Sequence, residues 1–155
     1  MKKDFTRDYT TEAFRMYAAM GKPTYDEARA AIYNAELSKR RLMPPDIAIT
    51  QAQSAVNKRE SLLLDILAVG KTIELLEKGG RKYIVSAIEE VYFVSPSSHL
   101  SRGDISQRVR RYALKCPTDE RTVYRWLKEA RLLCAAVRGL RITPPEEKQI
   151  AQMCQ

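Results

Sequence analysis

Arg121-Thr122-Val123-Tyr124-Arg125-Trp126-Leu127 is a stretch in which apolar and basic side chains alternate at helical spacing. On a helix of 3.6 residues per turn, one apolar stripe runs through Val123, Trp126, Leu127, Ala130, Cys134 and Val137. The opposite face carries Arg121, Tyr124, Arg125 and Lys128, and its centre holds no acid. The pattern predicts a helix over about residues 119–137 that buries one side and presents cations and a phenol on the other.

Positive charge is concentrated around this stretch. The 155-residue chain has a formal net charge of +8. Eleven Lys or Arg residues lie between Arg102 and Arg141 against four acids, whereas the rest of the chain holds sixteen bases and fifteen acids. Such a cluster favours a polyanionic partner, because bound cations displace counterions condensed on phosphates. A basic face that is merely solvated is the alternative.

Residues that could carry metal or nucleophilic chemistry are few. The chain has three cysteines, Cys116, Cys134 and Cys154, and one histidine, His99. They cannot supply four metal ligands at finger-like spacing, and an odd number of cysteines argues against a disulfide framework. No nucleophile has a nearby base, so we expect no catalytic residue, no metal and no cofactor.

Gly70-Lys71-Thr72 is similar to the end of a phosphate-binding loop. That loop needs a glycine five residues before Gly70, where the chain has Asp65, and no strand is predicted to precede it. We interpret the match as chance.

Membrane segments are not predicted. No run approaches the roughly 18 apolar residues that a membrane-spanning helix requires, and no apolar core follows Met1-Lys2-Lys3. We therefore expect reduced thiols, a cytoplasmic location and no membrane partner.

The first part of the chain reads as a series of helices. Thr10 to Met20 predicts a short first helix, which Gly21 and Pro23 end. Thr24-Tyr25-Asp26-Glu27 has the form of a capping box and predicts the start of a second helix. Pro44-Pro45 ends that helix, because neither proline can donate a backbone hydrogen bond.

A third helix is predicted from Asp46 to Lys78. Its apolar stripe consists of Leu62, Ile66, Val69, Ile73 and Leu76, and Leu63 and Leu67 add a second flank. A surface this broad either packs under other helices of the chain or faces a partner copy. The second interpretation predicts a homodimer through residues 46–78.

Gly79-Gly80 marks the predicted boundary between an N-terminal helical region, residues 1–78, and a module of residues 80–142. Residues 143–155 form a tail. The module begins with a helix whose stripe is Ile84, Ala87, Ile88 and Val91. Ser101-Arg102-Gly103-Asp104 is predicted to cap a second helix, whose stripe is Ile105, Val109, Tyr112 and Cys116.

Only Cys116-Pro117-Thr118-Asp119 separates that helix from the one over residues 119–137. Two helices so joined, the second basic on its outer face, predict an all-α helix-turn-helix module whose second helix enters the major groove of double-stranded DNA. Arg121, Tyr124 and Arg125 lie in the first turns and are predicted to contact base edges. The predicted phosphate contacts are Lys128, Arg108, Arg111 and Lys115.

Residues Asp119 to Leu127 resemble the recognition helix of bacterial helix-turn-helix regulators, and Leu100 to Ala135 is similar to the fourth region of sigma factors. With its helical opening, the chain resembles phage and prophage late-transcription regulators of the ArpU and RinA kind. The resemblance implies promoter-region binding and a possible contact with RNA polymerase. A DNA-packaging protein such as a small terminase subunit is the alternative, because it can use the same module.

Overall fold

The fold is all-α. The computed structural model describes residues 4–140 and 144–153, and within these residues every regular element is a helix. The helices are α1 (Phe5–Ala19), α2 (Tyr25–Lys39), α3 (Pro45–Asn57), α4 (Glu60–Lys78), α5 (Lys82–Val91), α6 (Asp104–Lys115), α7 (Glu120–Arg138) and α8 (Pro144–Met153). None of the helices in these ranges combines the length and the apolar character needed to cross a bilayer.

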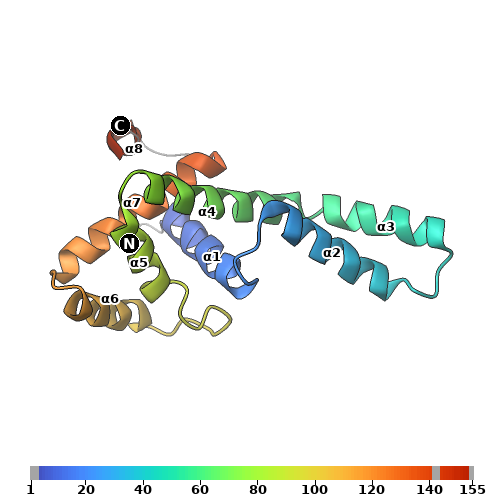
Figure 1. Cartoon of the computed structure of the whole chain (residues 1–155), viewed down its shortest axis with the longest axis horizontal. Helices are drawn as coiled ribbons and strands as arrows, with labels where there is room; N and C mark the ends of the chain where they lie inside the picture. The colour runs from blue at the N-terminus through green and yellow to red at the C-terminus, as the bar shows by residue number, and fades with distance from the viewer. Residues whose placement is uncertain (1–3, 141–143, 154–155) are drawn as a thin grey trace.

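The molecule has a helical body and a projecting arm (Figure 1). In the body, α1, α4, α5, α6 and α7 pack around the larger core, whose fully buried residues include Phe14, Val69, Ile88, Val109 and Leu127. This core takes residues from both sides of Gly79-Gly80, which form a tight turn in which Gly80 has a φ of +73°. Residues 80–140 therefore share one core with α1 and α4.

The arm consists of α2 and α3, which lie side by side at one end of the long axis (Figure 1). A smaller core joins them to the start of α4 through Ala28, Ile32, Val56, Leu63 and Ile66. The capping box predicted at the start of α2 is confirmed. The backbone amide of Glu27 donates to Thr24 Oγ1 at 3.2 Å, and the amide of Thr24 donates to Glu27 Oε2 at 3.2 Å.

Two predicted helix boundaries in the N-terminal region were wrong. α1 begins at Phe5 instead of Thr10, because the Asp4 carboxylate caps it by accepting a hydrogen bond from the Arg7 amide at 2.9 Å. The single helix predicted from Asp46 to Lys78 is two helices that meet at Lys58 and Arg59, where the Arg59 backbone leaves helical angles. The break lets α3 pack against α2 while α4 enters the body.

The cap predicted before α6 forms only in part. The backbone amide of Ser101 donates to Asp104 Oδ2 at 2.7 Å, as a capping box requires. The Ser101 side chain makes no cap, because Gly103 is the residue at the cap position and adopts a φ of +88°. A residue with a side chain would be strained at this φ, so the glycine fixes the start of α6.

The apolar stripe of α4 belongs to the core of the chain. Within it, Ile66, Val69 and Leu76 are almost fully buried, and Leu63 on the flank is buried as well. Helices α1, α2, α5 and α7 cover these residues. The core interpretation of the stripe thus holds, and the stripe does not offer a surface for the homodimer predicted through residues 46–78.

Candidate nucleic-acid interface

Helices α6 and α7 are joined by a four-residue turn, Cys116 to Asp119. The Cys116 amide donates to the Tyr112 carbonyl at 2.8 Å, and the Thr118 amide donates to the Ala113 carbonyl at 3.3 Å, which closes the end of α6. Asp119 then caps α7 by accepting from the Thr122 amide at 2.6 Å. The turn is therefore held by backbone bonds on one side and by a side-chain cap on the other.

The Asp119 carboxylate is held in its charged form. Hydrogen bonds from the side chain and the backbone of Thr122 lower the pKa of Asp119 most, and the charges of Arg121 and Arg125 lower it further. A carboxylate at this position also faces the positive end of the helix dipole. The start of α7 is thus fixed against fraying.

Helix α5 lies beneath both helices and sets their mutual position. Ile84 and Ile88 of α5, Val109 of α6 and Leu127 of α7 are all fully buried in the same core. The Tyr112 hydroxyl also donates to the Tyr83 carbonyl at 3.2 Å, which ties α6 to the start of α5. The buried face of α7 packs against both α5 and α6, so the three-helix unit holds α7 rigidly.

The two halves of α7 differ in burial. In the first half only one stripe is buried, through Val123, Leu127 and Ala130. In the second half the buried positions run all round the helix, as Leu132, Leu133, Cys134 and Ala135 show. Helices α1, α4 and α8 pack against α7. Arg138 near its end bonds Asp65 of α4, and Arg131 and Leu132 line a crevice with residues of α1 and α8. The outer face of α7 is consequently open to a partner only as far as Lys128.

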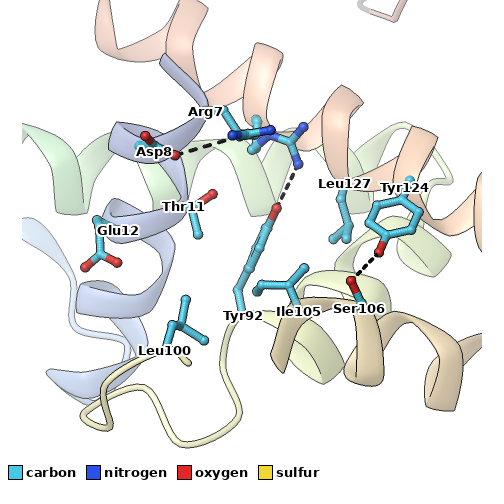
Figure 2. Close-up of a pocket in the computed structure, with 11 residues that line it drawn as sticks. Arg7, Asp8, Thr11, Glu12, Tyr92, Leu100, Ile105, Ser106, Tyr124 and Leu127 are labelled. Carbon is cyan, nitrogen blue, oxygen red and sulfur yellow. Dashed lines mark hydrogen bonds and ion pairs between the residues drawn. The ribbon is translucent and has the colours of Figure 1, made fainter. Parts of the chain in front are cut away.

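That open face carries the cations predicted from the sequence. Arg121, Arg125 and Lys128 are exposed, and none of them makes a hydrogen bond or an ion pair with any residue that the structure describes. Tyr124 is 40% exposed, and its hydroxyl donates to Ser106 Oγ at 3.2 Å, which aims the ring toward the start of α6 (Figure 2). The structure therefore brings all four residues to one accessible surface.

The charged residues at the edges of this surface have internal partners. Glu129 lies 3.9 Å from Arg81 at the start of α5. Arg131 donates to the Tyr92 hydroxyl at 2.8 Å. The open cations are thus distinct from neighbours that hold the fold together.

The bases of α6 divide in the same way. Arg108 is half-buried and donates to the Val91 carbonyl at 2.9 Å, at the negative end of α5. Lys115 pairs with Glu90 at 3.0 Å and Arg110 pairs with Glu120 at 3.3 Å, both at the surface. Arg111 is exposed and has no ionic partner among the described residues. Of the predicted phosphate contacts, Arg111 and Lys128 are uncommitted, whereas Arg108 and Lys115 are engaged within the chain.

Helix α1 borders the interface, which the sequence did not indicate. A cleft of about 470 Å³ lies between α1, the end of α5, the start of α6 and the middle of α7. Figure 2 shows Asp8, Thr11 and Glu12 of α1 along one side and Ile105, Ser106 and Tyr124 along the other. Arg15 of α1 also donates to the Ser98 carbonyl, which fastens the loop before α6. No local pattern could have revealed these contacts, because they join residues more than eighty positions apart.

Trp126 is less buried than its place in the stripe predicted. It lies at the edge of the core and packs against the Tyr83 ring, with ring centroids 4.9 Å apart and an interplanar angle of 59°. Leu127, the next residue, is fully buried instead. Tyr83 belongs to α5, so the indole lies at the margin of the contact between α5 and α7.

The described residues contain no group of three or more His, Cys, Asp or Glu side chains placed to hold a metal ion. His99 is exposed in the loop before α6. Burial raises the pKa of the Cys134 thiol to about 12, which keeps it protonated and unreactive at neutral pH. Cys154, like Arg141, lies outside the described residues.

Gly70-Lys71-Thr72 lies inside α4 and has no loop geometry. The Thr72 hydroxyl is buried and donates to the Ala68 carbonyl at 2.7 Å. Helical hydrogen bonds occupy the amides that a phosphate loop would leave free, so this segment cannot cradle phosphates.

Comparisons of the chain with protein-family models, with curated proteins and with solved structures found no match.

Proposed function

We propose that the chain is a sequence-specific DNA-binding protein and that the open half of α7 is the surface that enters the major groove. The observation that carries this proposal is the set of exposed cations Arg121, Arg125 and Lys128, which have no hydrogen-bonding or ionic partner in the described part of the chain. They follow a four-residue turn on a helix that is rigidly backed by α5. A major groove about 12 Å wide admits a helix presented in this way.

The position of each side chain suggests its role. Arg121, Tyr124 and Arg125 lie in the first two turns of α7, which would enter most deeply, so we assign them to base edges. An arginine there can make two hydrogen bonds to guanine O6 and N7. Lys128 lies a turn later, and we assign it with Arg111 to phosphate groups. Arg108 and Lys115 would reach phosphate only by leaving their present partners.

Within DNA-binding proteins, we propose a transcription regulator of the phage type, on the resemblance of residues 100–135 to the fourth region of sigma factors. A contact with RNA polymerase is implied by that resemblance alone. A packaging protein such as a small terminase subunit is favoured by one feature, the α2–α3 arm, which offers a surface for assembly at the end of the molecule away from α6 (Figure 1). A stable ring of subunits would support packaging, and a monomer or dimer would support regulation.

The proposal is tested by replacing two of the open cations separately. A preferred site is first selected from fragments of the source genome that the protein retains. Arg125→Ala is then expected to weaken binding to this site by about 1–3 kcal/mol and to flatten the preference among base variants at one position. Lys128→Ala is expected to weaken binding to all sequences alike and to lower the salt slope by about one. Fluorescence anisotropy at several salt concentrations measures both effects.

Lys78→Ala is the matched control, because it removes one positive charge from an exposed lysine that pairs with Glu74 at 2.7 Å on α4. It is expected to leave affinity, sequence preference and salt slope unchanged. Two outcomes would show that α7 is not the surface that reads DNA. Arg125→Ala and Lys128→Ala could lower the affinity equally for all sequences, or neither could lower it. Arg111 would then be the next residue to replace.

A further inference from the structure

The α2–α3 arm is only two helices thick (Figure 1). It leaves several apolar side chains exposed to solvent. Its interior is made of small residues, among them Ala28, Ala48 and Ala52. On its surface, Ile47 and Ile49 of α3 are 45% and 43% exposed, and Leu42 at the tip is 96% exposed. An isolated pair of helices cannot bury both of its faces, so one face of the arm is free for a partner.

One face of the arm is hollowed. A groove of about 280 Å3 runs between the two helices and is lined by Asp26, Arg29, Ala30, Tyr33, Gln53 and Val56. Ile49 precedes Gln53 by four residues and Val56 by seven, which places it on this same side of α3. Ile47 lies about 160° around the helix from Ile49 and faces away from the groove.

The groove face carries little charge. Asp26 and Arg29 contribute one charge of each sign. Asp46, the one charged residue among the 13 of α3, lies three residues before Ile49 on the same side, so two acids and one base leave a net charge of −1. The chain as a whole has a net charge of +8, and 30% of its residues are charged. Two copies of such a basic chain repel each other at most orientations, and a face with little net charge is where they can approach at the least cost.

We propose that the groove is the surface on which a second copy of the chain docks, so that two arms form a four-helix bundle. In a two-fold contact each copy contributes the same face, and the acid of one copy can meet the base of the other. Asp26 and Arg29 supply that pair, and Arg29 is held only loosely by Glu60, 4.0 Å away at the surface. Ile49, Ala30 and Tyr33 supply the apolar contact.

The expected dimer is of modest strength. The helices of 15 and 13 residues are each about 20 Å long. A contact along helices of this length buries an area at the low end of the range for stable protein interfaces. The dimer should therefore dissociate on dilution. The docking does not rest on the proposed DNA binding, since the arm and the open face of α7 lie in different parts of the molecule (Figure 1).

Sedimentation equilibrium of the full chain tests the proposal. The unmutated chain is expected to shift from monomer to dimer as its concentration rises. Ile49→Glu is expected to raise the dissociation constant about tenfold or more, because it places a carboxylate in the apolar contact. Ile47→Glu is the matched control, since it makes the same chemical change on the same helix at nearly the same exposure. It is expected to leave the dissociation constant unchanged.

Circular dichroism checks that both variants keep the helical content of the parent chain, as exposed positions should. A parent chain that stays monomeric up to about 1 mM would overturn the proposal. So would a ring of higher order, or an Ile47→Glu variant that dissociates as readily as Ile49→Glu. The hydrodynamic readout does not involve DNA, so its failure is distinguishable from failure of the proposed DNA binding.

Discussion

Leu127→Ala is expected to lower the free energy of unfolding by about 2–5 kcal/mol, the range found for leucines in well-packed cores. The Leu127 side chain is fully buried where α5, α6 and α7 meet. Its removal leaves a cavity that the surrounding helices can fill only in part. The loss of stability therefore includes the hydrophobic free energy of the deleted atoms and the cost of the cavity. Urea denaturation followed by circular dichroism measures the change.

Trp126→Ala is the informative comparison, because the two residues are neighbours on the same helix. The indole is partly exposed and packs mainly on the Tyr83 ring, so its loss is expected to cost less than the loss of Leu127. If the Trp126→Ala variant proved the less stable of the two, Trp126 and not Leu127 would be the main anchor of α7.

The faces of α7 could be predicted because their cause is local. An apolar stripe at 3.6-residue spacing determines which side of a helix is buried, and the opposite side follows from it. Arg121, Arg125 and Lys128 lie on that opposite side and are exposed. The start of α2 was predictable on the same ground, since both hydrogen bonds of its capping box join residues three positions apart.

The partners of the cations could not be predicted, because they depend on helices that are distant in sequence. Arg108 and Arg111 look alike in the sequence, yet only Arg108 reaches the Val91 carbonyl. The difference arises from the crossing of α5 and α6. In the same way, the apolar stripe of α4 was compatible with a core position and with a dimer contact. The structure shows that α1 and α7 cover it.

The kink between α3 and α4 has no signal in the sequence. Neither proline nor glycine occurs near Lys58 and Arg59, and the helical pattern continues through them. The chain bends there because Val56 packs with α2 while Leu63 and Ile66 pack at the root of the arm. Tertiary packing has overridden local propensity, and the break defines the arm whose groove is proposed to bind a second copy.

Asp65→Ala is expected to lower the free energy of unfolding by about 3 kcal/mol, the lower end of the range for a broken buried ion pair. Asp65 of α4 accepts hydrogen bonds from Tyr9 of α1 at 2.6 Å and from Arg138 of α7 at 2.7 Å. The side chains of Asp65 and Arg138 are 13% and 19% exposed, so little solvent can replace the lost carboxylate. Arg138 would keep its hydrogen bond to the Ser61 hydroxyl at 3.0 Å.

This cluster fixes the far end of α7, as Leu127 fixes its middle. Hydrogen bonding to Asp65 is the largest cause that raises the pKa of Arg138, in keeping with a guanidinium that depends on this carboxylate. If α7 binds DNA as proposed, the Asp65→Ala variant is therefore expected to lose affinity for every DNA sequence to the same degree, because α7 would be held less firmly while its open face is unchanged.

Asp8→Ala is the control, since Asp8 also pairs with an arginine, Arg7, at 3.7 Å, but both side chains are more than half exposed. A surface pair of this kind contributes about 0–1 kcal/mol, so the unfolding curve should hardly move. Chemical denaturation of the two variants and the parent chain gives the comparison. If Asp65→Ala were no more destabilising than Asp8→Ala, the Tyr9–Asp65–Arg138 cluster would not be what joins α1, α4 and α7, and the direction of α7 would have to be set by the apolar core alone.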